Sequence, residues 1–477
     1  MRRRGSPGRA SPGIGCGGKP MSSLPPGPRM PPILQLLNWI FRPIPFMEEC
    51  ARRYGDWFTV RFLRFPKRLT FVFTSDPEAI KEVFAGNPDQ LHAREANLVL
   101  KPVLGEHSLL LLDGPRHVQE RRRMMPAFHG ERMQVYCAIT REVADRSIDA
   151  WPLGRPFPIL AAMQEMTLGV ILRMMFGSGE SDDLFRLRRD LKRILALMAN
   201  PMMFLLGGAG GEGRSARRRS RLGPVSPWER ACRLLREVDS ILLAEIAKRR
   251  AAGGRGGEDI LTLLVQAGDG NGRSMSDAEL RDGLVTLLVA GHETTATALS
   301  WVFYRLLRHP EVLAKLRAEL DGVVGSHLVG PEHLGQLRYL DAAVMETLRL
   351  NPTVPLVGRS LQVPLRIGAR DLPAGVVVAP CIYLTHRRPD LWPDPERFAP
   401  ERFLEERGAP QGFFPFGGGV HRCLGMAFAV QEMKVIIAQV LSRVVLRRVP
   451  GYTARVVRRN ISFAPSEGMP VIVEGRP

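Results

Sequence analysis

The sequence predicts a mostly α-helical fold with a small β-rich lobe. Most of the chain from Pro77 to Leu350 has the apolar periodicity of helices, interrupted by glycine and proline. One apolar run, from Leu284 to Leu307, contains few helix breakers and predicts a long internal helix. Short runs rich in β-branched and aromatic residues predict strands at Trp57–Phe62 and Leu69–Phe73. Further strands are expected near Leu361–Ile367 and close to the C-terminus.

The composition predicts one large domain. The chain has 477 residues, 45% of them apolar, and no interior linker divides it, so residues 21–477 are expected to form a single unit. Residues 1–20 contain five cationic side chains, no acid, and much glycine, proline and serine. This composition predicts a disordered basic extension. Met21 follows it directly, so either Met1 or Met21 is the native start.

The sequence has few of the patterns that are typical of membrane-spanning segments, zinc sites or disulfide frameworks. The longest apolar stretches are interrupted before the ~18 residues that span a bilayer, so no transmembrane anchor is expected. The run Ile33–Phe41 is long enough only to lie on a membrane surface. Six scattered cysteines without a C-x-x-C pair argue against zinc and against a disulfide framework, and they predict a reducing, cytoplasmic location.

The most specific pattern is a glycine-rich loop, Phe416–Gly425, that presents Cys423 before a helical segment beginning at Met426. The positive end of a helix favours the thiolate form of cysteine, which binds metals. Glycines allow the backbone to turn sharply and lie close to a flat ligand. The alternative for an isolated cysteine is a buried structural thiol.

Phe416, Gly419, His421, Cys423 and Gly425 reproduce the signature F-x-x-G-x-[RH]-x-C-x-G. The chain therefore resembles the cytochrome P450 family of haem-thiolate monooxygenases. The resemblance extends roughly from residue 25 to the C-terminus. It implies the triangular-prism P450 fold, haem b as cofactor, and the thiolate of Cys423 as axial ligand of the iron.

An E-x-x-R pair lies upstream, at Glu346 and Arg349, three residues apart on one predicted helix. An isolated pair of this kind is often a surface ion pair worth ~0.5 kcal/mol. The resemblance implies a structural trio with Arg402 that fixes the loop of Cys423. A proline-rich stretch from Thr385 to Phe398 resembles the family's meander.

The apolar run Leu284–Leu307 resembles the family's central helix over the distal face of the haem. Ala290 and Gly291 are small, and Thr294 lies one turn after Ala290, which leaves room for O2 beside a hydroxyl. Glu293 supplies an ionisable group for proton delivery. The alternative is an ordinary helix interior whose threonines bond back to carbonyls. Adjacent helix positions point about 100° apart, so neighbouring His292 is assigned to packing or water bridging.

His117 and Arg121 are four residues apart, on one helix face. A haem carries two propionates that need cationic or hydrogen-bonding partners, and the resemblance implies that Arg359 and His421 complete this set. The alternative, a basic surface helix, fits Arg116, Arg122 and Arg123 better.

The resemblance also implies a substrate pocket lined by Ala290, Thr294, Val354, Pro355 and Leu356. Its apolar character predicts a hydrophobic substrate such as a fatty acid, terpenoid or polyketide.

The formal net charge of +19 is concentrated in Arg116–Arg123, Arg214–Arg221 and Lys248–Arg255. The last two runs lack interleaved aromatic residues, so solvated connectors are expected there and nucleic-acid binding is not. In the family the first run lies on the side that receives electrons. It predicts docking of an acidic ferredoxin or flavodoxin, which with its reductase delivers electrons from NAD(P)H.

These features predict a monomeric monooxygenase that uses O2 to hydroxylate or epoxidise its substrate. A haem sensor that binds a ligand or gas without turnover needs no proton relay. A peroxygenase or isomerase on the same scaffold commonly lacks the acid–threonine pair, which Glu293 and Thr294 preserve here.

Overall fold

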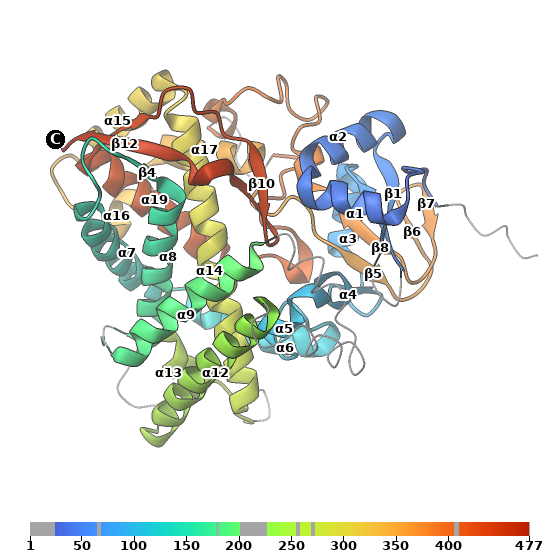
Figure 1. Cartoon of the computed structure of the whole chain (residues 1–477), viewed down its shortest axis with the longest axis horizontal. Coiled ribbons are helices and arrows are strands. Elements are labelled where there is room, and N and C mark those ends of the chain that lie inside the picture. Colours follow the sequence, from blue (N-terminus) through green and yellow to red (C-terminus); the bar gives the residue numbers. More distant parts are fainter. Residues whose placement is uncertain are drawn as a thin grey trace, which may run out of the picture.

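The computed structural model describes residues 24–63, 68–177, 179, 181–200, 227–253, 258–268, 272–404 and 410–476. The predicted basic extension, the candidate start Met21 and the run Arg214–Arg221 lie outside the described residues. The described chain forms a large helical part with a smaller strand-rich lobe at its side, as predicted (Figure 1).

The strand-rich lobe contains a five-stranded sheet in the order β1-β2-β8-β5-β3. Antiparallel β1 and β2 confirm the two predicted strands, and Phe58 faces Phe73 across them with stacked rings 5.1 Å apart. The segment near Leu361–Ile367 contains the end of one strand and the whole of another. The strands of the lobe are β1 (Trp57–Leu63), β2 (Arg68–Thr74), β3 (Leu91–His92), β5 (Arg359–Leu361), β6 (Leu365–Ile367), β7 (Arg370–Leu372) and β8 (Val377–Pro380).

The predicted C-terminal strands form two further sheets. One is the hairpin of β10 (Val456–Arg459) and β11 (Ser462–Pro465), whose turn contains Asn460 in the left-handed region at φ 53°. The other joins β4 (Pro156–Pro158), β12 (Pro470–Gly475) and β9 (Val445–Arg448). The indole of Trp301 donates to the carbonyl of Phe463 (2.8 Å), which fixes the hairpin to the central helix.

Helices form the rest. Those of the N-terminal half are α1 (Pro32–Phe41), α2 (Pro43–Tyr54), α3 (Pro77–Ala85), α4 (Arg94–Asn97), α5 (Lys101–Leu104), α6 (Gly114–Met124), α7 (Arg132–Asp149), α8 (Ile159–Phe176) and α9 (Asp182–Met198). Those of the C-terminal half are α12 (Pro227–Ala251), α13 (Ile260–Gln266), α14 (Asp277–Leu306), α15 (Pro310–Val323), α16 (Pro331–Leu334), α17 (Arg338–Leu350), α18 (Ile382–Thr385) and α19 (Met426–Arg443). Short 3₁₀ turns include η4 (Pro400–Phe403) and η5 (Gly419–His421).

The central helix α14 contains the predicted apolar run. It begins earlier than that run because Ser276 and Glu279 form a capping box that satisfies the first backbone N–H groups. Its 30 residues, about 45 Å at 1.5 Å per residue, carry buried side chains on all sides. Because α8, α17, α19 and the hairpin all pack against it, α14 is the axis of the core.

Two expectations are corrected by the helices. Helix α8 is 18 residues long and apolar enough to cross a bilayer by length and composition, but 67% of it is buried in the core between α7 and α14. Lys248, Arg249 and Arg250 form the last turn of α12 rather than a solvated connector. All three side chains pair with acids, Lys248 with Glu245, Arg249 with Asp259 and Arg250 with Asp277.

Candidate active site

The loop that carries Cys423 is packed tightly against the end of α3. Gly419 has φ 65°, and a Cβ there would lie 1.8 Å from the carbonyl oxygen of Phe84. Only glycine allows this approach and this backbone conformation. The backbone N–H of Cys423 donates to Phe416 (3.0 Å), which closes the loop, and Gly425 is the N-cap of α19. The predicted position of the cysteine just before a helix is therefore correct.

The thiol of Cys423 is accessible, yet the surrounding protein raises its pKa by desolvation. A hydrogen bond with the backbone of Gly425 and the positive charges of Arg121 and Arg422 act in the opposite direction. The helix end thus lowers the pKa of the thiol by less than desolvation raises it, contrary to the expectation that the helix end would favour the thiolate by itself. A metal bonded to the sulfur would deprotonate it outright.

Four predicted side chains converge beside this loop from three elements. His117 and Arg121 come from α6, Arg359 begins β5, and His421 lies in η5. The two imidazole rings are 4.0 Å apart. Desolvation and the nearby arginines lower the pKa of His117 to about 4 and that of His421 to about 2. Arg359 is 6% exposed and has its pKa lowered to about 10 by burial.

This cluster has too few acceptors for its donors. Among the described residues, His117 Nδ1 and His421 Nε2 are buried without a hydrogen-bond partner, and a carboxylate oxygen of Asp113 is 3.9 Å from His421 Nε2. The guanidinium of Arg359 donates only to the neighbouring carbonyl of Gly358, at 2.9 Å. Unpaired buried polar groups are costly. The donor set therefore fits the carboxylates of a bound anionic group such as the propionates of haem.

The middle of α14 has the surface that an oxygen site needs. Ala290 is exposed and Gly291 and Thr294 are half-buried, although the flanking turns of the helix are buried. The hydroxyl of Thr294 donates to the carbonyl of Ala290 (2.7 Å). The hydroxyl of Thr295 likewise donates to the carbonyl of Gly291 (3.2 Å). Both bonds are those expected of the alternative, an ordinary helix interior. The exposed backbone at Ala290 is the feature that an oxygen site also requires, and the role of Thr294 stays a prediction.

Glu293 points to the β10–β11 turn. Its Oε2 accepts from the amide of Asn460 (2.9 Å), and its Oε1 lies 3.8 Å from Arg459 Nε without a hydrogen bond. The residue is 5% exposed, and burial raises its pKa. The carboxyl group therefore holds a proton at a pH where an ordinary glutamate is ionised. Asn460 and Arg459 were not identified from the sequence, where they signal only a turn.

His292 packs on the opposite side of the same turn. It is buried, its Nδ1 contacts the carbonyl of Leu288 (2.6 Å), and desolvation lowers its pKa to about 4. A second buried acid, Glu432 of α19, was also missed. Its carboxyl forms a hydrogen bond with the hydroxyl of Thr295, and burial raises its pKa well above the usual range.

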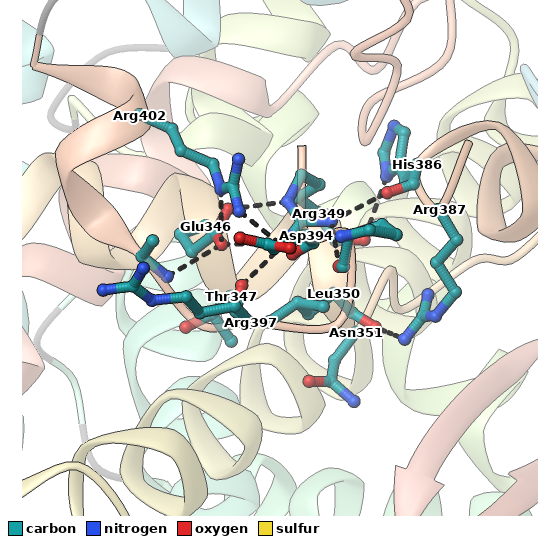
Figure 2. A network of polar contacts seen from close by, with 12 residues as sticks. Glu346, Thr347, Arg349, Leu350, Asn351, His386, Arg387, Asp394, Arg397 and Arg402 are labelled. Carbon is teal, nitrogen blue, oxygen red and sulfur yellow. Dashed lines mark hydrogen bonds and ion pairs between the residues drawn. The ribbon is translucent and has the colours of Figure 1, made fainter. Parts of the chain in front are cut away.

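Two members of the predicted trio, Glu346 and Arg349, form a completely buried ion pair (Figure 2). Arg349 donates from Nε and Nη2 to the two carboxylate oxygens of Glu346, at 2.7 and 2.8 Å. Its other three N–H groups donate to the carbonyls of His386, Pro395 and Arg397. All five guanidinium donors are therefore used.

Arg402 completes the trio from η4. Its Nε lies 3.5 Å from Glu346 Oε1, and its Nη2 donates to the carbonyl of Asp394 (3.0 Å). The same Oε1 accepts from the backbone of Ala399 (3.0 Å). The trio thus binds the proline-rich meander directly, and the cysteine loop only through a further residue.

That residue is His386, which the sequence did not single out. Its Nε2 accepts from the backbone N–H of Phe414 (2.9 Å), at the start of the cysteine loop. Its Nδ1 must then carry the hydrogen and donate to the carbonyl of Arg349 (3.2 Å). Desolvation lowers its pKa to about 3, which keeps the ring neutral.

Three of the five proposed pocket residues, Val354, Pro355 and Leu356, follow α17, and the other two, Ala290 and Thr294, lie on α14. Val354 and Leu356 are half-buried, whereas Pro355 is buried and its carbonyl accepts from the backbone of Tyr383 (3.0 Å). Arg123, assigned above to a basic surface, is instead buried and pairs with Glu120 (2.6 Å). Arg116 and Arg122 are exposed on α6.

Comparison with known proteins agrees with this geometry. Residues 25–455 match the family model "Cytochrome P450". The chain is 40% identical over 453 residues to "Putative cytochrome P450 135B1" of Mycobacterium tuberculosis, which covers 93% of this chain and 90% of that protein. It is 34% identical over 459 residues to "Putative cytochrome P450 138" of Mycobacterium bovis, with 96% and 98% covered.

Solved structures show the same fold. The haem domain of cytochrome P450DA superposes with a TM-score of 0.81 at 24% identity, over 95% of this chain and 98% of that one. A cyanobacterial protein, CYP120A1 with bound retinoic acid, superposes with a TM-score of 0.80 at 25% identity, over 96% and 100%. The match of family model, relatives and fold extends over nearly the whole chain, and it implies haem as the cofactor. The chain therefore belongs to the cytochrome P450 family.

Proposed function

We propose that this P450 inserts one oxygen atom of O2 into a hydrophobic organic substrate, by C–H hydroxylation or epoxidation. The observation that carries the proposal is the acid–hydroxyl pair on α14. Glu293 is a buried acid with a raised pKa, and neighbouring Thr294 holds its hydroxyl beside accessible backbone at Ala290. Oxygen activation consumes protons, whereas reversible ligand binding does not.

Haem, when bound, supplies oxygen activation after reduction, and the chain supplies placement and protons. The thiolate of Cys423 would bind the haem iron. His117, Arg121, Arg359 and His421 are the proposed partners of the propionates. Two buried nitrogens, His117 Nδ1 and His421 Nε2, have no hydrogen-bond partner among the described residues, and they support this role because a carboxylate would satisfy them.

The acid–hydroxyl pair moves the protons. Glu293 donates the proton that it retains because burial raises its pKa. The hydroxyl of Thr294 orients the group that receives this proton and passes the proton to it. Glu293 is then reprotonated from solvent on the side of the β10–β11 turn.

The electron donor is proposed to be an acidic ferredoxin or flavodoxin with its reductase. Arg116 and Arg122 are exposed on α6, the helix that also carries two proposed propionate partners. Attraction between such a surface and an acidic protein is screened by salt. Turnover with an acidic ferredoxin should therefore fall as ionic strength rises, and turnover independent of salt would contradict this docking. The cytoplasmic location and the monomeric state stay predictions.

The substrate class is supported by the apolar residues Val354 and Leu356. The structurally similar CYP120A1 is solved with retinoic acid, an apolar acid, which is consistent with a lipophilic substrate here. Shifts of the haem spin state across a panel of fatty acids, terpenoids and polyketides would identify the class.

The test compares Thr294→Ala with Thr297→Ala. Thr297 is buried one turn further along α14, and its hydroxyl has no hydrogen-bond partner. Thr294→Ala should release peroxide at the expense of product, while Thr297→Ala keeps the wild-type coupling. Equal coupling in all three proteins would remove Thr294 from proton delivery.

Two further measurements separate the alternatives. Cys423→Ser should abolish the strongly red-shifted Soret band of the reduced CO complex, and Cys137→Ser, at a buried cysteine of α7, should retain it. Product formed under ¹⁸O2 should carry the label. An unlabelled product would indicate a peroxygenase or isomerase, and no product across the panel a sensor.

A further inference from the structure

Helix α1 presents an apolar face to solvent. Met30, Ile33, Leu34 and Phe41 are 37%, 45%, 45% and 57% exposed, and Leu37 between them is half-buried. Successive helix positions are about 100° apart, so Ile33, Leu34, Leu37 and Phe41 lie along one side of α1, and Met30 lies just before the helix begins. Single exposed apolar residues are ordinary, but a continuous row on one helix marks a contact surface. These five residues are called the outer face of α1.

The opposite face holds α1 rigidly on the strand-rich lobe. Gln35 is buried, its amide donates to the carbonyls of Pro28 (3.1 Å) and Met30 (2.8 Å), and its oxygen accepts from the backbone of Arg61 (2.8 Å). Trp39 packs edge-on against Phe73, with ring centroids 5.9 Å apart. Because this face is fixed, the outer face cannot rotate into the core. Figure 1 shows α1 at the surface of the lobe.

Uncompensated positive charge lies beside both ends of α1 and on the neighbouring strand β1. Arg29 and Arg42, at the two ends of the helix, and Arg61 on β1 are exposed, and they make no ion pair with any of the described residues. The nearby acids of α2 are occupied, since Glu49 pairs with Arg52 and Glu48 accepts from Tyr383. Residues 1–63 contain ten cationic and three acidic side chains.

We propose that the outer face of α1 binds peripherally to an anionic phospholipid surface. An apolar helix face flanked by arginines suits the boundary between acyl chains and anionic headgroups. The ten residues of α1 are about 15 Å long, far too short to span a bilayer, so the helix lies parallel to the surface. Stable peripheral binding needs two signals, and the apolar face and the cationic residues supply one each.

The charges favour lipid over a second copy of the chain. A two-fold interface would place the outer face against itself and bring Arg29 and Arg42 of one copy near the same arginines of the other. Like charges would then meet at both ends without an acid between them. A bilayer containing phosphatidylglycerol offers the complementary charge.

The experiment is flotation of the full-length haem-loaded protein with vesicles. One set contains phosphatidylglycerol and phosphatidylcholine, and the other phosphatidylcholine alone. The protein should float with the anionic vesicles at low salt, and at least ten-fold less with neutral vesicles or in 0.5 M salt, where the Debye length is about 4 Å.

Variants locate the contact. The triple substitution Ile33→Asn, Leu34→Asn, Phe41→Asn should reduce partition into anionic vesicles at least ten-fold. A matched control replaces exposed apolar residues elsewhere, Leu153, Phe185 and Leu328, which are 61%, 55% and 65% exposed. The control should bind like the wild type, and both variants should retain the CO spectrum because none of the six residues lies in the proposed haem site.

Several outcomes would overturn the proposal. These are wild-type protein that binds no anionic vesicle, equal loss in the control, or full binding by the triple variant. Loss of binding on removing residues 2–20, with full binding by the triple variant, would assign the contact to the N-terminal segment. A wild-type dimer that the triple variant converts to a monomer, without vesicle binding, would make the outer face an interface between copies.

Discussion

Replacing Arg349 by lysine tests the buried ion pair at the centre of the fold. The arginine uses five N–H groups, two on Glu346 and three on the carbonyls of His386, Pro395 and Arg397. An ammonium has three donors, so at least two acceptors lose their bonds in a site that water does not reach. At about 1–3 kcal/mol for each unsatisfied buried group, the substitution should destabilise the protein by about 2–6 kcal/mol. Domains are typically stable by only about 5–15 kcal/mol.

The assay is urea unfolding followed by circular dichroism, with the CO spectrum as a second readout. Two matched substitutions provide the comparison for this loss of stability. Arg402→Lys should cost less than Arg349→Lys, because Arg402 makes one bond, to Asp394, and a longer contact of 3.5 Å with Glu346. Arg397→Lys should be close to neutral because that side chain is exposed. A cost below about 1 kcal/mol for Arg349→Lys, or equal costs for all three, would refute the reasoning.

Two other predictions concern the acid and the cysteine loop. Asn460→Ala removes the hydrogen bond that stabilises the Glu293 carboxylate and lowers its pKa, so the pKa of Glu293 should rise further above the usual range. The carboxylic acid band in infrared pH titration, assigned with Glu293→Gln, would show this, and an unchanged midpoint would contradict it. Gly419→Ala should displace the loop from Phe84 and abolish the thiolate CO band, whereas Gly417→Ala, where a Cβ has nothing within 4 Å, should add only backbone strain. Equal spectra for the two variants would count against steric control of the loop.

Local patterns predicted the elements well because they depend on neighbouring residues. The apolar run from Leu284 to Leu307 coincides with α14 except for its last residue, which is the C-cap, and the two strands β1 and β2 match their predicted ranges within two residues. The start of α14 was missed, although Ser276 and Glu279 show a capping-box spacing in the sequence. Helix α8 shows the opposite case, since a buried core helix and a membrane span share the same apolar composition.

Contacts between distant segments were not predictable from one sequence. Asn460 and Glu293 are 167 positions apart, and nothing near either residue indicates the other. The same holds for His386, whose role arises only because α17 and the cysteine loop approach it from two sides. Arg123 resembled its exposed neighbours in sequence, but its side chain turns inward to Glu120. The proposed roles at Cys423 rest on the family signature and await the experiments above.

The β10–β11 hairpin joins two distant parts of the molecule. Phe463 and Arg458 lie against Trp39 of α1, and the turn residue Asn460 holds Glu293. Exchange of a short hairpin between relatives is a natural way to engineer a new product profile. In this chain such a graft would also replace the partner of the acid and the support beneath α1. A successful graft must therefore keep an amide at the position of Asn460 and an aromatic ring at the position of Phe463. Otherwise a change in product selectivity could not be separated from a loss of coupling between electron use and product formation.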